Sequence, residues 1–73
     1  MKEITITLTE EMASAMIKHY TCFIENADKA WEEQDIVAYE GCLRQSTALE
    51  MVINDLGFAF RKSYDGTYVI VEI

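Results

Sequence analysis

Residues 58–73 read FAFRKSYDGTYVIVEI, and this stretch decides the fold class. Aromatic and β-branched residues fill both of its halves, which is typical of strands. Asp65-Gly66 lies between the halves and favours a two-residue type I′ turn, because aspartate and glycine tolerate positive φ. We therefore predict a β-hairpin in which Tyr64 faces Thr67. In that register one face of the hairpin carries Phe58, Phe60, Val69, Val71 and Ile73, and the other carries Ala59, Arg61, Tyr68 and Ile70.

The segment before this hairpin has the period of a helix that ends near Gly57, a residue suited to a left-handed C-cap. Asp35 is a good N-cap for this helix. Its main apolar stripe is predicted to contain Ala38, Cys42, Gln45, Leu49, Val52, Ile53 and Leu56. The polar residues 32–35 (EEQD) before it indicate a tight turn after another helix, although the two helices could also run on as one.

The preceding helix is expected to start at Glu10, because Thr9 can cap it and Glu10 and Glu11 suit the positive end of the helix dipole. Apolar residues then recur every three or four positions, so one side should face the core. The opposite side should be exposed and carries Lys18, Cys22, Glu25 and Lys29. The core-facing stripe is predicted to contain Met12, Met16, Tyr20, Phe23, Ala27, Ala30 and Trp31.

At the start of the chain, Ile4, Ile6 and Leu8 alternate with threonines, a pattern that predicts a half-buried strand. The expected fold is α+β, with one domain over residues 1–73. Its order is β-α-α-β-β, with an antiparallel helical hairpin packed on one face of a three-stranded sheet. The apolar run at residues 68–71 favours the last strand as the central one, with a simple antiparallel meander as the alternative.

The chain has 73 residues and a formal net charge of −7, which opposes direct binding to nucleic acid and to anionic membranes. It has no apolar run near the roughly 20 residues that span a bilayer. We expect a cytoplasmic protein with both cysteines reduced.

Catalytic and metal-binding motifs are not evident in the sequence. His19 and Cys22 are three residues apart on a helix, a spacing that a metal ion or a thiolate-imidazolium pair can use. A metal site needs more ligands, and the offset of Cys42 along the second helix disfavours its joining them. We therefore expect no enzyme activity, no metal and no cofactor.

Two features point to a protein partner. Ile36, Tyr39 and Leu43 form a second apolar stripe, rotated away from the main stripe of their helix, which could form a homodimer or receive another protein. The mixed hairpin face is an alternative surface for either role. Carboxylates crowd the predicted interhelical turn, where Lys29 is the only base, and they are Glu25, Asp28, Glu32, Glu33, Asp35 and Glu40.

These acidic residues could steer a basic partner, or simply keep a small protein soluble. The sequence thus favours a small, self-associating, non-catalytic regulatory module that binds another protein. The alternative is an inhibitor whose carboxylates mimic nucleic-acid phosphates and so block a DNA- or RNA-binding protein.

Overall fold

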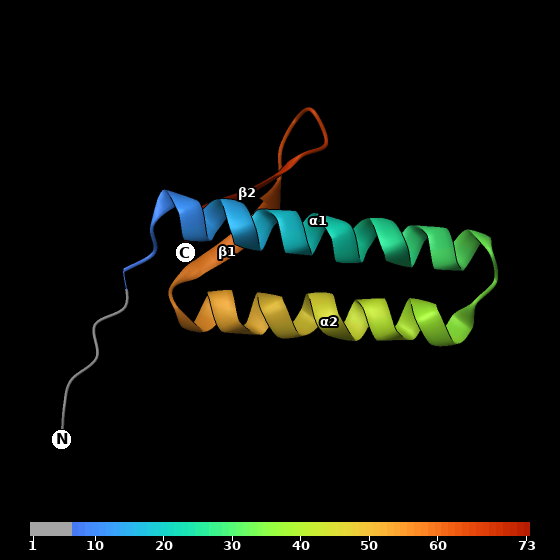
Figure 1. Cartoon of the computed structure of the whole chain (residues 1–73). Coiled ribbons are helices and arrows are strands. Elements are labelled where there is room, and N and C mark those ends of the chain that lie inside the picture. Colours follow the sequence, from blue (N-terminus) through green and yellow to red (C-terminus); the bar gives the residue numbers. More distant parts are fainter. Residues whose placement is uncertain (1–6) are drawn as a thin grey trace, which may run out of the picture.

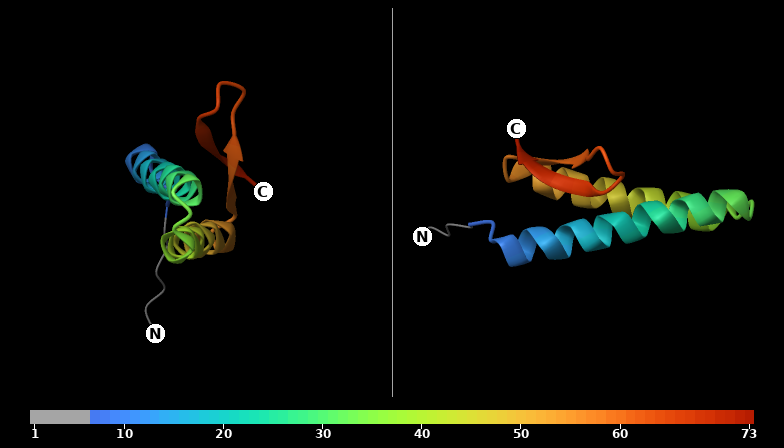
Figure 2. Two further views of the ribbon diagram at one scale, coloured as in Figure 1. Left: turned by 90° about the vertical axis from the view of Figure 1, so that its right-hand side faces the viewer. Right: turned by 90° about the horizontal axis from the view of Figure 1, so that it is seen from above.

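A computed structural model describes residues 7–73 of the chain. Two helices, α1 (Glu10–Glu32) and α2 (Ile36–Asp55), form an antiparallel pair, and β1 (Phe58–Lys62) and β2 (Tyr68–Glu72) follow as a hairpin. The hairpin packs to one side of the helix pair, near the N-terminal half of α1 and the C-terminal half of α2 (Figure 1, Figure 2). The α+β class and the helical hairpin are confirmed.

Both helices begin where their capping residues predict. Thr9 is extended, and its hydroxyl oxygen accepts a hydrogen bond from the Met12 amide at 3.2 Å. Asp35 does the same for α2, with its carboxylate 3.2 Å from the Ala38 amide nitrogen. Each side chain satisfies an amide that the helix itself leaves without a partner.

The connection between the helices is a tight turn, as expected, but its left-handed residue is a glutamine. Gln34 has φ 58°. Its amide donates to the carbonyl of Trp31 at 3.1 Å, and the Asp35 amide donates to the carbonyl of Ala30 at 2.8 Å. This pair of bonds is the Schellman motif, which usually places glycine at the left-handed position. Asp35 therefore helps to end α1 and also caps α2.

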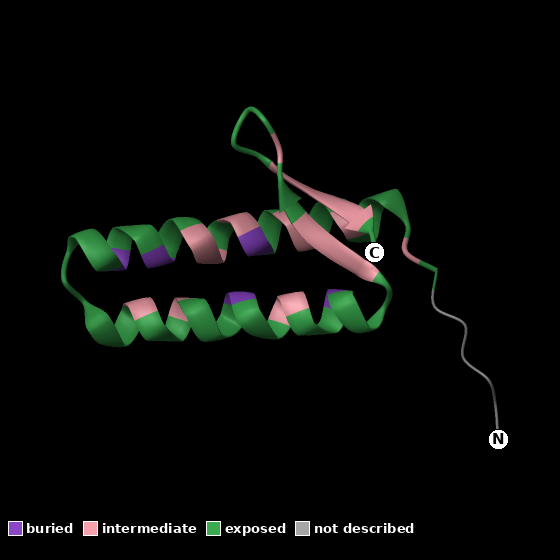
Figure 3. Cartoon of the chain, turned by 180° about the vertical axis from the view of Figure 1, so that it is seen from behind, coloured by how far each residue is buried: buried purple, intermediate pink, exposed green. Residues whose placement is uncertain are grey.

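The core runs along the facing sides of the two helices and extends to the hairpin (Figure 3). Ile53 is fully buried, and Tyr20, Ala27 and Ala30 of α1 are also buried. The predicted polar side of α1 is exposed along its length. Within α1, Trp31 and Met12 depart from their predicted core positions, since they are 60% and 38% exposed.

The predicted core stripe of α2 is only partly correct. Cys42, Leu49 and Ile53 face inward, whereas four of the predicted members are exposed, namely Ala38, Gln45, Val52 and Leu56. Tyr39, Ser46 and Glu50 take their place on the inner side. α2 has apolar residues on nearly every side, so periodicity alone could not indicate which side meets α1.

The hairpin forms in a register one residue away from the predicted one. Phe60 pairs with Ile70, and Lys62 pairs with Tyr68. Gly66 is the only turn residue with positive φ, at 90°, whereas a type I′ turn needs two. The loop has three residues, 64–66, with Ser63 opposite Thr67, and the Gly66 amide donates to the Ser63 carbonyl at 3.0 Å.

This shift changes the composition of both sheet faces, because neighbouring residues in a strand point to opposite sides. Phe58 and Phe60 share their face with Tyr68 and Ile70, so the predicted grouping of the two phenylalanines with Val69, Val71 and Ile73 is wrong. The predicted outer patch of Ala59, Arg61, Tyr68 and Ile70 is likewise divided between two faces. Tyr68 faces the helices, with its ring edge-on to that of Tyr20.

The predicted first strand is only partly within the described residues, because Ile4 and Ile6 lie outside them. Residues 7–9 are not in a strand, and the hydroxyl of Thr9 is used as the helix cap. Within residues 7–73 the sheet has two strands, in the order β1-β2, so the three-stranded sheet with a central last strand is not seen there. No helix in this part of the chain has the length and apolar character needed to cross a membrane.

Candidate partner-binding surface

The end of the helix pair where α1 turns into α2, residues 31–36, is called the tip. The hairpin lies beside the other half of the helices and leaves the tip without a covering sheet (Figure 2). At the tip, the ring of Trp31 packs against that of Tyr39, with 5.0 Å between centroids and a 50° tilt. Tyr39 is half-buried by this contact, whereas Trp31 stays 60% exposed. A large aromatic surface therefore faces solvent.

A shallow pocket of about 290 Å³ opens beside this aromatic pair, lined by Trp31, Gln34 and Ile36. Gln34 reaches it from the left-handed position of the turn, and Ile36 from the first residue of α2. Pockets for small molecules and cofactors usually start near 300 Å³ and enclose most of the ligand. This pocket is at that lower limit and is open to solvent.

The predicted second stripe of α2 lies along the same side of the molecule as this pocket. Ile36 is 51% exposed and Leu43 is 36% exposed, as expected for residues outside the main core. Tyr39 differs, because its ring is engaged by Trp31. We call Trp31, Ile36, Tyr39 and Leu43 the tip patch. Trp31 was predicted to lie in the core and not at a binding surface. Its position one residue before the acidic turn was the feature of the sequence that could have indicated exposure.

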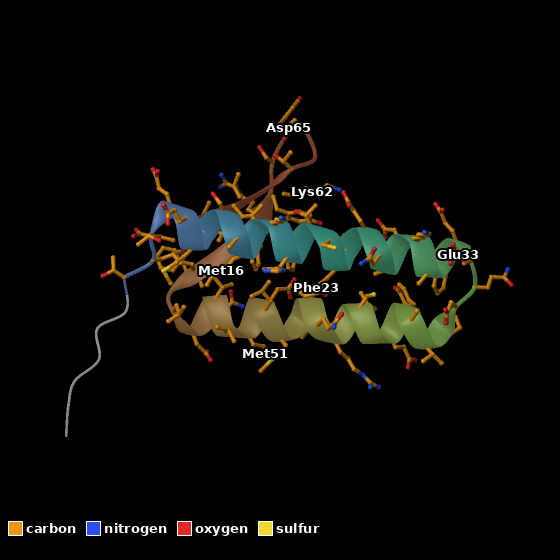
Figure 4. All side chains as sticks on the ribbon, viewed as in Figure 1. Met16, Phe23, Glu33, Met51, Lys62 and Asp65 are labelled. Carbon is orange, nitrogen blue, oxygen red and sulfur yellow. The ribbon has the colours of Figure 1, made fainter. Side chains whose placement is uncertain are left out.

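All six predicted carboxylates are exposed and lie around the tip: Glu25, Asp28, Glu32, Glu33, Asp35 and Glu40. Glu33 lies at the turn itself (Figure 4). Asp35 also has a structural role as the cap of α2. The remaining acids follow within about two helical turns on α1 or α2. These six residues, called the acidic rim, place negative charge on both helices near the turn.

The histidine and cysteine residues have ordinary structural surroundings. The ring of His19 stacks near Phe23, with 6.4 Å between centroids, and the Cys22 sulfur accepts from the Asn26 side chain at 3.6 Å. Cys22 and Cys42 are free thiols. Within residues 7–73, no three histidine, cysteine, aspartate or glutamate side chains are arranged to hold a metal ion.

The main internal polar contact lies in the other half of the molecule. The Tyr20 hydroxyl donates to Oε1 of half-buried Glu50 and so links α1 to α2. Burial raises the pKa of Tyr20, and the hydrogen bond and charge of Glu50 raise it further. The tyrosine therefore stays protonated near neutral pH, and this pair is a structural link away from the tip pocket.

No protein-family model, curated protein or solved structure matches the chain. The role of the tip therefore has to be inferred from its own geometry and chemistry.

Proposed function

We propose that the chain is a non-catalytic, self-associating regulatory module that binds a basic segment of another protein at its tip. The observation that carries this proposal is the tip patch. There, Trp31 is 60% exposed beside a pocket that it lines with Gln34 and Ile36, and exposed carboxylates lie nearby on both helices.

The apolar part of the tip has the composition of a binding hot spot. Tryptophan and tyrosine are enriched among the residues that dominate interface energies, because they bury a large rigid surface. Trp31 is held against Tyr39 and is presented in one orientation before any partner arrives. An apolar side chain inserted beside Trp31 and Ile36 would remove both residues from water.

The acidic rim supports a basic partner. The net charge of the whole chain is −7, and Lys29 is the only base between the first and last carboxylates of the rim. Such a field attracts basic segments over a Debye length and speeds their association, while rim ion pairs themselves add little affinity. The matching partner is therefore a segment in which lysine or arginine residues flank one large apolar side chain.

The alternative is nucleic-acid mimicry by the same carboxylates. A mimic relies on charge alone, so its binding should weaken steeply with salt. The exposed Trp31 beside the pocket favours the first proposal, because an apolar contact made there would persist at salt concentrations that weaken binding by charge alone.

Trp31 is the only tryptophan of the chain, so its fluorescence can report directly on the tip. The test titrates the protein with a short lysine-rich peptide containing one central leucine, and with an all-lysine peptide of equal charge. We expect the leucine peptide to shift Trp31 emission to shorter wavelength and to retain binding at high salt. The all-lysine peptide should bind only at low salt.

Substitutions at the tip then separate the proposals. Ile36→Glu should abolish the shift by the leucine peptide, whereas Lys18→Glu, on the exposed opposite side of α1, is the matched control and should not. The nucleic-acid mimic predicts a different pattern. The double variant Glu32→Lys, Glu33→Lys would abolish binding of both peptides, whereas Ile36→Ala and Leu43→Ala would leave peptide binding unchanged. Failure of both peptides to bind at any salt concentration would overturn a basic partner at the tip.

A further inference from the structure

α2 exposes more apolar surface than its contacts within one chain account for. Val37 is 82% exposed, Met51 is 62% exposed and Val52 is 53% exposed. Figure 4 shows Met51 on the side of α2 that points away from α1. By contrast, only four hydrophobic residues are buried in the described part of the chain, and Ile53 is the only one of these on α2. Small domains often compensate for so limited a core by oligomerising.

One line of residues along this outer side is complementary to itself. Arg44, Ala48, Met51 and Asp55 follow at steps of four, three and four residues, so they lie in a single row on the helix. All four are exposed. The row reads basic, small, large, acidic in one direction. In the opposite direction the order is acidic, large, small, basic. Two such rows placed antiparallel therefore pair a basic residue with an acidic one and a small residue with a large one.

We propose that this outer face of α2 binds the same face of a second copy of the chain, with the two helices antiparallel. A two-fold axis between residues 49 and 50 places Arg44 opposite Asp55 of the second copy, and Ala48 opposite its Met51. A two-fold contact of this kind uses one surface twice, which requires such self-complementarity. The small Ala48 leaves room for the large Met51 side chain, as in knobs-into-holes packing.

Charge excludes the competing orientation. In a parallel pair, Arg44 would face Arg44 and Asp55 would face Asp55, and like charges opposed at an interface are costly. The antiparallel pair replaces these repulsions with two attractive pairs at its ends. The row is short, so the interface should be smaller than the roughly 800 Å² per partner of a typical stable complex. The dimer should therefore depend on protein concentration.

This interface is separate from the tip patch. Leu43 precedes Arg44 by one residue and so points about 100° away from it around the helix axis. The antiparallel arrangement leaves both tips free, at opposite ends of the dimer. The inference thus deepens the self-association part of the proposed function and does not depend on what the tip binds. It also differs from the stripe of Ile36, Tyr39 and Leu43 that the sequence suggested for dimerisation.

The test is the molar mass in solution by light scattering across a range of concentrations, with a charge swap. Arg44→Asp and Asp55→Arg should each raise the dimer dissociation constant about tenfold or more, because each places like charges together. The double variant, which restores opposite charges, should return it to within a few-fold of the native value. Met51→Glu should give a monomer, and circular dichroism checks that each variant keeps its helices.

Leu43→Glu is the matched control, since Leu43 is exposed on the same helix but outside the row. Its dimer should persist. A native monomer at every concentration would overturn the inference, as would a dimer that Leu43→Glu dissociates and Met51→Glu does not. Lack of rescue by the double charge variant would also contradict the antiparallel register. Peptide binding by the Met51→Glu variant, measured by Trp31 fluorescence, tests the tip separately. The variant should still bind the leucine peptide if the tip proposal is correct, whatever its oligomeric state.

Discussion

Tyr20 on α1 donates a hydrogen bond from its hydroxyl to Glu50 on α2. The ring of the same tyrosine stacks on Phe60 of β1, with 4.1 Å between centroids and 8° between planes. It also meets the ring of Tyr68 of β2 edge-on at 4.9 Å. One side chain on α1 therefore contacts the other three elements, and its removal should loosen all of them together.

Tyr20→Phe keeps the ring but leaves half-buried Glu50 without its donor. Hydrogen bonds to charged groups contribute about 1.5–3 kcal/mol, so we expect a loss of about 2 kcal/mol in unfolding free energy, measured by urea denaturation. Tyr20→Ala should cost about 3–5 kcal/mol, because it also removes the aromatic packing. Glu50→Gln retains an acceptor and is the control with the smaller effect. An unchanged midpoint for Tyr20→Phe would contradict this account of the contact.

The same residue predicts a dependence on alkaline pH. The pKa of Tyr20 is raised in the folded protein by burial first, and then by the hydrogen bond and charge of Glu50. Its folded pKa thus lies above its unfolded value near 10, so the stabilisation is complete below pH 10 and is lost as pH rises above it. Denaturation midpoints should fall more steeply above pH 10 in the native protein than in Tyr20→Phe. Equal slopes would count against the raised pKa.

Gln34 should be a position where glycine is better than the natural residue. A side chain in the left-handed region costs about 1–2 kcal/mol, and Gln34 has φ 58°. Gln34→Gly removes this strain, although glycine also loses more conformational entropy on folding. We therefore expect the unfolding free energy to rise by about 1 kcal/mol. Gln34→Ala keeps the strain and is the matched control. A thermal melting temperature that falls for the glycine variant would show that the turn relaxes in another way.

Asp65 should make the hairpin turn sensitive to acid. Its carboxylate accepts from the Thr67 hydroxyl at 2.7 Å and from the Thr67 amide at 3.1 Å. These bonds, the hydroxyl bond first, lower the pKa of Asp65 in the folded state. Its contribution is therefore present above the unfolded pKa near 3.9 and is lost as pH falls through the lower folded value.

The measurement is the NMR chemical shift of the Thr67 amide during acid titration. It should move with a midpoint below 3.9 in the native protein and stay nearly constant in Asp65→Asn, whose amide oxygen still accepts but does not ionise. Asp65→Ala should lose the bonded position of this resonance at every pH. A midpoint at or above 3.9 in the native chain would argue against the two Thr67 contacts.

The helix boundaries were predictable because capping is a local interaction. Thr9 and Asp35 each bond an amide three residues further along the chain, so a short stretch of sequence is enough to indicate them. The hairpin register was not predictable in this way. The letters DG fit both a two-residue and a three-residue loop, and the actual loop includes the side-chain contacts of Asp65 with Thr67.

The candidate site was predictable only where it depends on one helix. The spacing of Ile36 and Leu43 indicated that they lie outside the core stripe, and both are exposed. The pairing of Trp31 with Tyr39 depends on how α1 and α2 cross, which helical period does not specify. For the same reason the sequence could not indicate which side of the apolar helix α2 would remain open, and therefore missed the row from Arg44 to Asp55.

The element order also has a consequence for the route by which the chain folds. α1 packs on α2, α2 on β1, and β1 on β2, so three of the four main packing contacts join consecutive elements. The contacts of α1 with the two strands, through Tyr20 against Phe60 and Tyr68, bring together more distant parts of the chain. Topologies rich in such local contacts fold within milliseconds or faster. We expect the helical hairpin to form early and the docking of Tyr68 against Tyr20 to be the step that completes folding.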